Sequence, residues 1–306
     1  MRYRERSEVV YVNDGSKDDT LAILDRFAAA APFPVRPHRN PATLGTTLNF
    51  NRAIGLCTGD IIFLCDQDDI WHPDKLARFA AEFANPAVGL VASDLELIDA
   101  GGRPLGRRVW TELPFTPDMQ QAVEAGQGPL LWTRYNTITG SAAAFRASLR
   151  DIIWPIPPAW NHDAWIALIA AAVSRVRLIR EPLTFYRVHA GQQIGSKPRT
   201  LRGEIASVRR MGAAYFANVA ECFDAAAGRL QPHRARLARP RIILDWLRGK
   251  AAFARGQQRM REGSRLGRIL PCLRGLGKGH YHRFARGWRS FAADLVLPTR
   301  REHYAP

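Results

Sequence analysis

Three carboxylates, Asp66, Asp68 and Asp69, stand within four residues, directly after the apolar run 61–65. A continuous apolar run predicts a strand covered on both faces, and ligands of open α/β sheets bind beyond the carboxyl ends of such strands. Crowded carboxylates beside an apolar strand repel one another unless a cation neutralises them, and oxygen ligands suit Mg²⁺ or Mn²⁺. The spacing predicts a metal and diphosphate site; an acidic loop that caps the next helix is the alternative.

Three other residues could do chemistry, and each also has a structural interpretation. Asp14 follows a second short strand and could accept a hydrogen bond from a base or ribose, or simply belong to a turn. Asp163 precedes an apolar helix, where it could take a proton from an attacking hydroxyl or cap the helix N-terminus. His189 could contact phosphate or a metal, although a lone histidine is usually structural. The pattern leaves these alternatives open.

The elements that must position these residues alternate between strand and helix. Strands are expected over residues 8–13, 61–65, 88–93, 176–179 and 183–188, and helices after Asp18 and over 46–56, 74–83 and 164–173. This alternation predicts a parallel or mixed sheet. In the first helix, Leu21, Leu24 and Phe27 are spaced for one buried face. Residues 100–135 carry glycines and scattered prolines and are expected to form an irregular excursion over the sheet edge.

The composition is that of an ordinary globular protein. The chain has 306 residues, of which 46% are hydrophobic and 24% charged, so disorder, collagen and coiled coil are excluded. No uncharged run approaches the roughly 18 apolar residues that cross a bilayer, and a signal-peptide pattern is missing, so we expect a cytoplasmic protein. The four cysteines lie far apart, which indicates reduced thiols rather than a zinc site or disulfides.

The net charge of +16 is confined to the rear of the chain. Residues 196–306 hold 24 Lys and Arg against 7 Asp and Glu, or +17, which leaves 20 basic and 21 acidic residues, or −1, for residues 1–195. This shift predicts a front catalytic or binding domain over 1–195 and a basic region over 196–306. A basic surface fits an anionic partner, either phospholipid headgroups or nucleic acid.

The basic region is expected to be helical, with aromatic residues between arginines, as in 283–291. Such helices can lie on an anionic membrane surface, so the protein would be peripheral at the inner face of the membrane. A solvated helical bundle that packs on the front domain is the alternative. Nucleic-acid binding is a third and less favoured class, because clustered acids in the front domain would repel polyanions and the chain has no recognised nucleic-acid motif.

The motifs taken together, and in this order, resemble family 2 glycosyltransferases of the GT-A fold. The matching segments are 11–20, 59–60, 66–71, 161–165 and 186–189. Asp-Gln-Asp-Asp-Ile-Trp and His-Asp-x-Trp look most like the rhamnosyltransferase branch, which builds surface polysaccharides. The likeness covers residues 8–195 and implies a mixed, mostly parallel sheet flanked by helices, followed by the basic helical extension.

The resemblance also implies a reaction and its residues. The reaction would be an inverting, Mg²⁺- or Mn²⁺-dependent transfer of a sugar, such as rhamnose, from a dTDP- or UDP-sugar to a glycan or lipid-linked acceptor. Asp14 and Asp66 would contact the nucleotide, Asp68 the metal, and Asp163 would be the catalytic base. Trp165 would wall the acceptor side, and His189 would lie near the diphosphate.

The front of the chain departs from the family pattern. In the family a strand and a helix precede the Asp-Gly-Ser strand, whereas only residues 1–7 do so here. We therefore expect the first strand and helix to be absent, either because the start codon lies upstream or because the gene is degraded. A nucleotide-binding pseudoenzyme without turnover is the corresponding alternative function.

Overall fold

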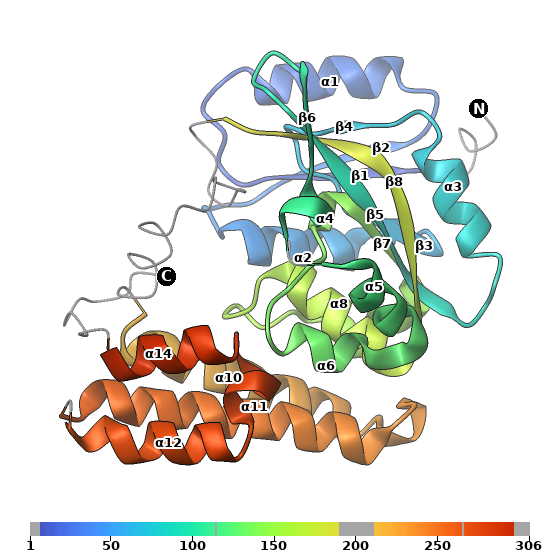
Figure 1. The fold of residues 1–306 in the computed structure, drawn as a ribbon. Coiled ribbons are helices and arrows are strands. Elements are labelled where there is room, and N and C mark those ends of the chain that lie inside the picture. The colour runs from blue at the N-terminus through green and yellow to red at the C-terminus, as the bar shows by residue number, and fades with distance from the viewer. Residues whose placement is uncertain (1–6, 114, 190–210, 265, 297–306) are drawn as a thin grey trace. The chain divides into compact units, whose positions relative to one another are not determined.

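The computed structural model describes residues 7–113, 115–189, 211–264 and 266–296 (Figure 1). The chain divides into two compact units, one formed by residues 1–116 and 138–187 and the other by residues 117–137 and 188–306. The boundary expected after residue 195 falls outside the described residues.

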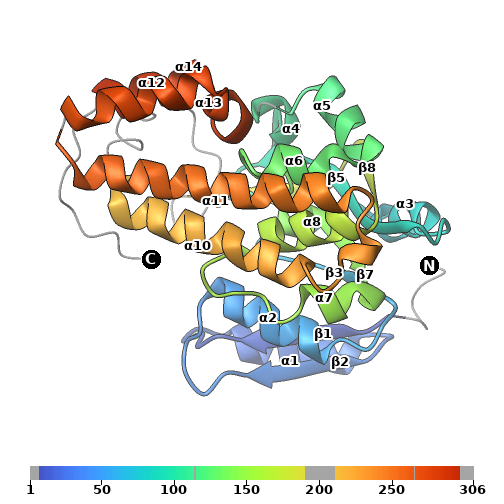
Figure 2. The ribbon, with the colours of Figure 1, turned by 90° about the horizontal axis from the view of Figure 1, so that it is seen from below.

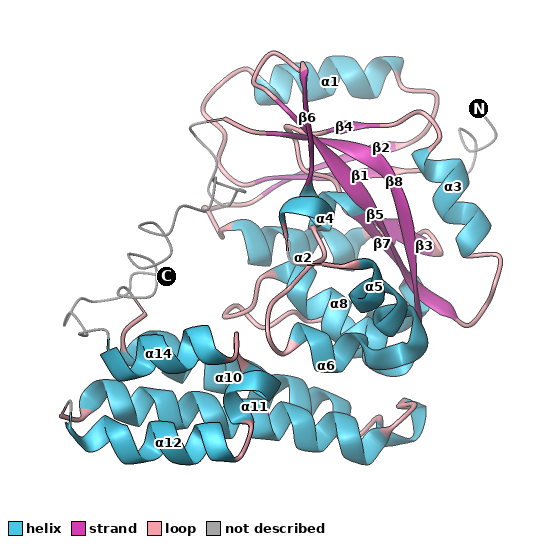
Figure 3. Ribbon diagram, viewed as in Figure 1, coloured by secondary structure: helices cyan, strands magenta, loops and turns pink. Residues whose placement is uncertain are grey.

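The strands of the first unit form two sheets. They are β1 (Val9–Asn13), β2 (Val35–Arg39), β3 (Ile61–Phe63), β4 (Ile70–Trp71), β5 (Val88–Ile98), β6 (Pro104–Arg108), β7 (Ala143–Arg146) and β8 (Arg175–Arg187). β1 and β2 form a two-stranded sheet. The other six form a second sheet in the order β3-β7-β5-β8-β4, with β6 beside β5 (Figure 3).

The mixed α/β class is confirmed, with parallel and antiparallel strand pairs in the sheets. Among the described residues only β1 with β2 and β5 with β8 pair in parallel. β7 runs antiparallel between β3 and β5, and the edge strands β4 and β6 are also antiparallel to their neighbours. Apolar runs show that a strand is buried but not which direction its neighbour takes, so the sequence pattern could not supply this detail.

Helices flank the sheets of the first unit. They are α1 (Thr20–Ala30), α2 (Thr46–Leu56), α3 (Lys75–Glu82), α4 (Val109–Glu112), α7 (Arg150–Ile153) and α8 (His162–Val173), with short 3₁₀ turns at Gly140–Ala142 and Ala147–Leu149. The buried face expected for α1 is only partial. Leu21 and Leu24 are half-buried and Phe27 is 45% exposed, so this helix buries no residue completely.

The core of the first unit is built around β5, which is buried along nearly its whole length. α3 and α8 both pack against it. The strand continues to Ile98, beyond its expected end, because Asp94 does not stop it. The Asp94 Oδ1 atom accepts hydrogen bonds from the backbone N–H groups of Leu95, at 2.8 Å, and Trp110, at 3.0 Å. The two strands expected over 176–188 are one long strand, β8, with register shifts in its pairing.

Residues 100–135 are not the irregular excursion that the sequence predicts. β6 and α4 lie in this stretch, and so do α5 (Pro117–Ala122), a π-helical turn (Val123–Gln127) and α6 (Gly128–Trp132). These elements are four to six residues long. They are too short to show a helical or strand period. The prolines and glycines at their ends are typical of loops, so the sequence pattern indicated irregular structure instead.

The second unit is helical, as expected. Besides α5 and α6 it contains α10 (Ala213–Leu230), α11 (Pro240–Glu262), α12 (Ile269–Gly277), α13 (His280–Phe284) and α14 (Trp288–Val296), with 3₁₀ turns at Arg234–Arg236 and Leu266–Arg268. α10 and α11 lie side by side (Figure 2). Phe253, Tyr281 and Phe284 form a buried aromatic cluster. None of the helices in the described part of the chain is long and apolar enough to span a bilayer.

Candidate active site

The acidic loop after β3 is held at the end of β8. Arg187, the last residue of β8, donates its backbone N–H to Asp69 Oδ1 at 3.1 Å. Its side-chain Nε donates to the backbone oxygen of Asp68 at 2.8 Å. These bonds fix the loop that carries Asp66, Asp68 and Asp69 against the sheet, as the position after a buried strand predicted.

The carboxylates of this loop share their surroundings with Asp163. Burial, together with repulsion from Asp69, Asp68 and Asp163, raises the pKa of Asp66 to about 7 against the opposing effect of the Lys75 ammonium. Charges perturb a pKa in this way only at short range, so Asp163 lies near the loop although almost a hundred residues separate them. The sequence predicted these residues separately, and the structure brings them together.

A tyrosine lies among the same four carboxylates. Burial, together with the negative charges of Asp69, Asp66, Asp68 and Asp163, raises the pKa of the Tyr186 phenol to about 12. Tyr186 is the penultimate residue of β8. Its phenol therefore stays protonated at neutral pH and can donate a hydrogen bond to an oxygen in the site.

Asp163 is the second residue of α8, close to the expected place at the helix N-terminus. Its Oδ1 atom accepts a hydrogen bond from the backbone N–H of Ala164 at 2.6 Å. Burial raises the pKa of the Asp163 carboxyl to about 6, against backbone hydrogen bonds from Ala164 and Gly140 that lower it. The group is thus ionised at neutral pH yet holds a proton better than an ordinary aspartate, which suits a general base.

The start of α8 is packed tightly. His162 is buried and stacks on Phe50, with ring centroids 4.0 Å apart and planes 10° from parallel. Burial lowers the pKa of His162 to about 4, so its ring is neutral at pH 7. A Cβ atom on Gly140 would lie 2.9 Å from His162 Nε2 and 3.5 Å from Asp163 Cβ. The small residues around 140 therefore allow a close approach between this turn and α8.

This close approach predicts the effect of a single methyl group. In Gly140→Ala the new Cβ pushes against His162 and moves Asp163, so we expect transfer activity to fall at least tenfold, with a lowered melting temperature. Gly59→Ala is the matched control, because its Cβ would meet only a backbone oxygen at 3.7 Å. Full activity in Gly140→Ala would show that the position of Asp163 does not depend on this contact.

Asp14 lies at the end of β1 and accepts hydrogen bonds from the loop before α2. Its Oδ1 atom accepts from Asn40 Nδ2 at 2.6 Å and from the Leu44 N–H at 2.7 Å, and its Oδ2 atom from the Gly45 N–H at 2.8 Å. Partial burial raises the pKa of Asp14, but these bonds outweigh it and lower the pKa overall. Asp14 therefore orders this loop, and its contact with a nucleotide stays a prediction.

Two residues of the predicted site are placed differently from the rest. Trp165 is fully buried, its Nε1 donates to the Ile153 oxygen at 2.7 Å, and its ring packs edge-on against Trp160. It belongs to the core, so the predicted acceptor contact is not supported. His189 follows the end of β8 by two residues and groups with the second unit, and its contact with a diphosphate stays a prediction.

Lys75 is a buried cation that the sequence pattern did not indicate. Lys75, the first residue of α3, is completely buried, and its Nζ donates to Thr184 Oγ1 at 2.9 Å and lies 4.0 Å from the centre of the Trp71 ring. Burial lowers the pKa of Lys75 to about 7, while Cys65 and the acidic loop raise it. A lysine six residues after an acidic cluster was the available signal, but lysines at helix starts are usually exposed.

Residues 2–150 match the sequence model of glycosyl transferase family 2. The matched segment is just under half of the chain and is similar to that family. The match begins at residue 2, which counts against the expected absence of the family's first strand and helix. It does not distinguish a rhamnosyltransferase branch within the family.

Individual relatives agree with the family and the fold. An uncharacterized glycosyltransferase of Nostoc sp. is 26% identical over 186 residues, which cover 60% of this chain and 56% of that protein. The chain thus spans little more than half the length of this relative. A Staphylococcus aureus TarS fragment in complex with UDP-GlcNAc is similar in fold, with a TM-score of 0.50 and 15% identity over 96% of this chain and 83% of the fragment.

A mannosyltransferase from Pyrobaculum calidifontis, solved in complex with GDP-Man and Mn²⁺, gives a TM-score of 0.45 at 19% identity, over 96% of this chain and 79% of that one.

The donor atoms of the acidic loop fit a hard divalent cation. Repulsion among Asp66, Asp68 and Asp69 shows that the loop holds more negative charge than Lys75 neutralises. The described residues contain no cluster of three or more His, Cys, Asp or Glu that could hold a metal alone. Mg²⁺ and Mn²⁺ commonly use one or two carboxylates and complete their shell with substrate phosphates and water. Asp66 and Asp68 would hold such an ion.

Proposed function

We propose that the protein is an inverting glycosyltransferase that moves a sugar from a nucleotide-diphosphate sugar to an acceptor hydroxyl. The observation that supports this most directly is the gathering of Asp163 and Tyr186 with Asp66, Asp68 and Asp69 at the ends of β3 and β8. This arrangement supports the proposal of a base beside an oxygen-rich cation site. The match of residues 2–150 to the sequence model of glycosyl transferase family 2 supports it.

The chemistry follows from the two kinds of carboxylate. Asp163, ionised at neutral pH, would accept the proton of the acceptor hydroxyl as that oxygen attacks the anomeric carbon. Attack from the face opposite the leaving nucleoside diphosphate inverts the configuration. A divalent ion on Asp66 and Asp68 would supply charge neutralisation to the leaving diphosphate. The phenol of Tyr186 would donate a hydrogen bond to an oxygen of the bound donor.

The finer assignments belong to the same proposal. A dTDP- or UDP-sugar is the expected donor, rhamnose the expected sugar, and a surface glycan or lipid-linked sugar the expected acceptor. The basic second unit would hold the enzyme at the inner face of the membrane. Asp14 and Asp66 would contact the nucleotide, and His189 the diphosphate.

The test is release of nucleoside diphosphate from a panel of UDP-, dTDP- and GDP-sugars, with Mn²⁺, with Mg²⁺ and with EDTA. We expect one nucleotide class to be cleaved only when a divalent ion is present, and a glycan acceptor to speed its release. Asp25→Asn, which changes an exposed aspartate of α1, should behave as the wild type. Binding of nucleotide without any turnover would favour the pseudoenzyme, and absence of nucleotide binding would overturn the proposal.

A further inference from the structure

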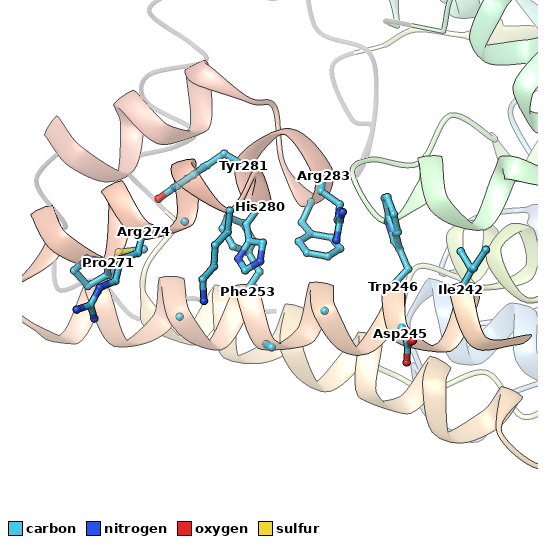
Figure 4. Close-up of a pocket in the computed structure, with 16 residues that line it drawn as sticks. Ile242, Asp245, Trp246, Phe253, Pro271, Arg274, His280, Tyr281 and Arg283 are labelled. Atoms are coloured by element: carbon cyan, nitrogen blue, oxygen red, sulfur yellow. The ribbon is translucent and has the colours of Figure 1, made fainter.

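A groove of about 530 Å³ opens in the second unit between α11 and the helices α12 and α13 (Figure 4). Gly249, Phe253 and Gly256 line it from α11. Their spacing of three and four residues puts them on one face of the helix. Because the two glycines have no side chains, the floor of the groove lies close to the helix backbone.

The two glycines of the floor have different surroundings. A Cβ on Gly249 would lie 2.7 Å from Phe284 Cζ, so this glycine lets α13 approach α11. A Cβ on Gly256 would meet no atom within 4 Å. The groove is therefore closed by an aromatic ring beside Gly249 and open beside Gly256. Its walls include Phe253 and Tyr281, whose rings meet edge to face with centroids 5.2 Å apart.

The groove carries an excess of positive charge. Arg274, Lys278 and Arg283 line it and are exposed, against one lining carboxylate, Asp245. Burial lowers the pKa of His280, and repulsion from Lys278 and Arg283 lowers it further, so both cations act on the same place. An anion bound there would relieve this repulsion.

Apolar side chains continue from the groove onto the surface of α12. Ile269, Leu270 and Leu273 are 43%, 54% and 51% exposed, and all three are on the same helix as Arg274. A helix that shows large apolar side chains to solvent beside cations is typical of segments that lie at a lipid interface.

We propose that this groove binds an anionic lipid, with its hydrocarbon chain along the face of α11 that carries Gly249, Phe253 and Gly256, and its phosphate on Arg274 and Lys278. A free phosphate would leave the apolar floor without a contact, whereas a phosphate joined to a hydrocarbon chain uses both features. All residues of this site belong to the second unit, so the proposal does not depend on the transfer reaction.

Filling the groove tests whether the chain occupies it. In Gly256→Leu the new side chain occupies the open space without a clash and raises helix propensity, so the protein should stay folded. We expect its binding to phosphatidylglycerol vesicles, measured by co-sedimentation at 0.1 M salt, to be at least tenfold weaker than that of the wild type. Gly228→Leu on α10 is the matched control, because its Cβ also meets no atom within 4 Å, and it should bind normally.

Reversing the cations tests the phosphate contact. Arg274→Glu with Lys278→Glu should weaken binding at least tenfold, whereas Arg234→Glu with Arg239→Glu, which makes the same change in net charge elsewhere in the unit, should weaken it less than threefold. Four results would each overturn the proposal. Two concern the variants: wild-type affinity in Gly256→Leu, and equal losses in the two double variants. Two concern the ligand: equal binding to phosphatidylcholine vesicles, and a soluble glycerol phosphate that binds as tightly as the lipid.

Discussion

Asp163→Asn should lower the turnover number for sugar transfer about a thousandfold while leaving the affinity for the donor nucleotide within a few-fold of the wild type. A positioned general base contributes roughly 10²- to 10⁴-fold, and an amide cannot take its proton. Initial rates at saturating donor and metal give the turnover number, and calorimetric titration with the nucleoside diphosphate gives the affinity. Asp25→Asn provides the matched carboxylate-to-amide control on α1. Unchanged turnover would remove Asp163 from the mechanism.

The same substitution should stabilise the protein above pH 6. Because burial raises the pKa of Asp163 from an ordinary value near 3.8 to about 6, the folded state holds this proton more tightly than the unfolded state. The stability linked to that proton is fully present below the unfolded pKa and is lost as the pH rises through about 6. Two pKa units correspond to about 3 kcal/mol at most, so the melting temperature of Asp163→Asn should exceed that of the wild type at pH 8 and match it at pH 4. Equal melting temperatures at both pH values would contradict the burial of a charged carboxylate.

The pH dependence of wild-type turnover follows from the same group. The fraction of ionised Asp163 rises with pH through about 6, so the turnover number should rise about tenfold per pH unit below that value and level off above it. The expected profile is measured at saturating donor and metal, where weaker binding at low pH does not contribute. A flat profile between pH 5 and 7 would contradict the assigned role.

Local features of the site could be predicted from the sequence because short chain segments produce them. The run before Asp66 and the apolar run after Asp163 each indicate an element, and each carboxylate lies at its end. The gathering of these ends could not be derived from periodicity, because it depends on β7 running antiparallel between β3 and β5. Only the order of the motifs, and the family that they resemble, pointed to a common site.

The features that the sequence missed are those in which long-range packing overrides the local pattern. The sequence predicts that Lys75 is a solvent-exposed residue at the start of a helix. The side chain is buried instead, and its ammonium donates hydrogen bonds to Thr184 Oγ1 and the Ser141 backbone oxygen. Trp165 matches a family motif, yet its indole packs in the core. The sequence predicts that the strand ends before Asp94. The carboxylate lies inside β5 instead, where it accepts hydrogen bonds from backbone N–H groups. The partners of Lys75 lie 66 and 109 residues away along the chain, and Asp94 is also bonded by Trp110, 16 residues away.

Asp68→Asn should weaken metal-dependent nucleotide binding at least tenfold. The loop concentrates negative charge that Lys75 does not neutralise, and a neutral amide at position 68 removes one of the two carboxylates proposed to hold the ion. Titration of nucleoside diphosphate with Mn²⁺, and again with EDTA, measures the metal-dependent part. Wild-type binding that is unaffected by EDTA would contradict the proposed metal site, and an equal loss in Asp25→Asn would show that general charge is responsible.

The proton on Asp66 provides a second and independent readout of the same site. Burial and the neighbouring carboxylates raise its pKa to about 7, so near neutral pH a large share of the protein carries this proton before an ion binds. Because an ion and a proton compete for the carboxylate, affinity for Mn²⁺ and nucleotide should rise from pH 6 to pH 8.

Binding at pH 7 should also release protons, which titrations in buffers of different ionisation enthalpy can count. In Asp66→Asn this release should disappear, whereas Asp163→Asn should retain most of it. A release that persists in Asp66→Asn would assign the proton, and with it the ion, to another group.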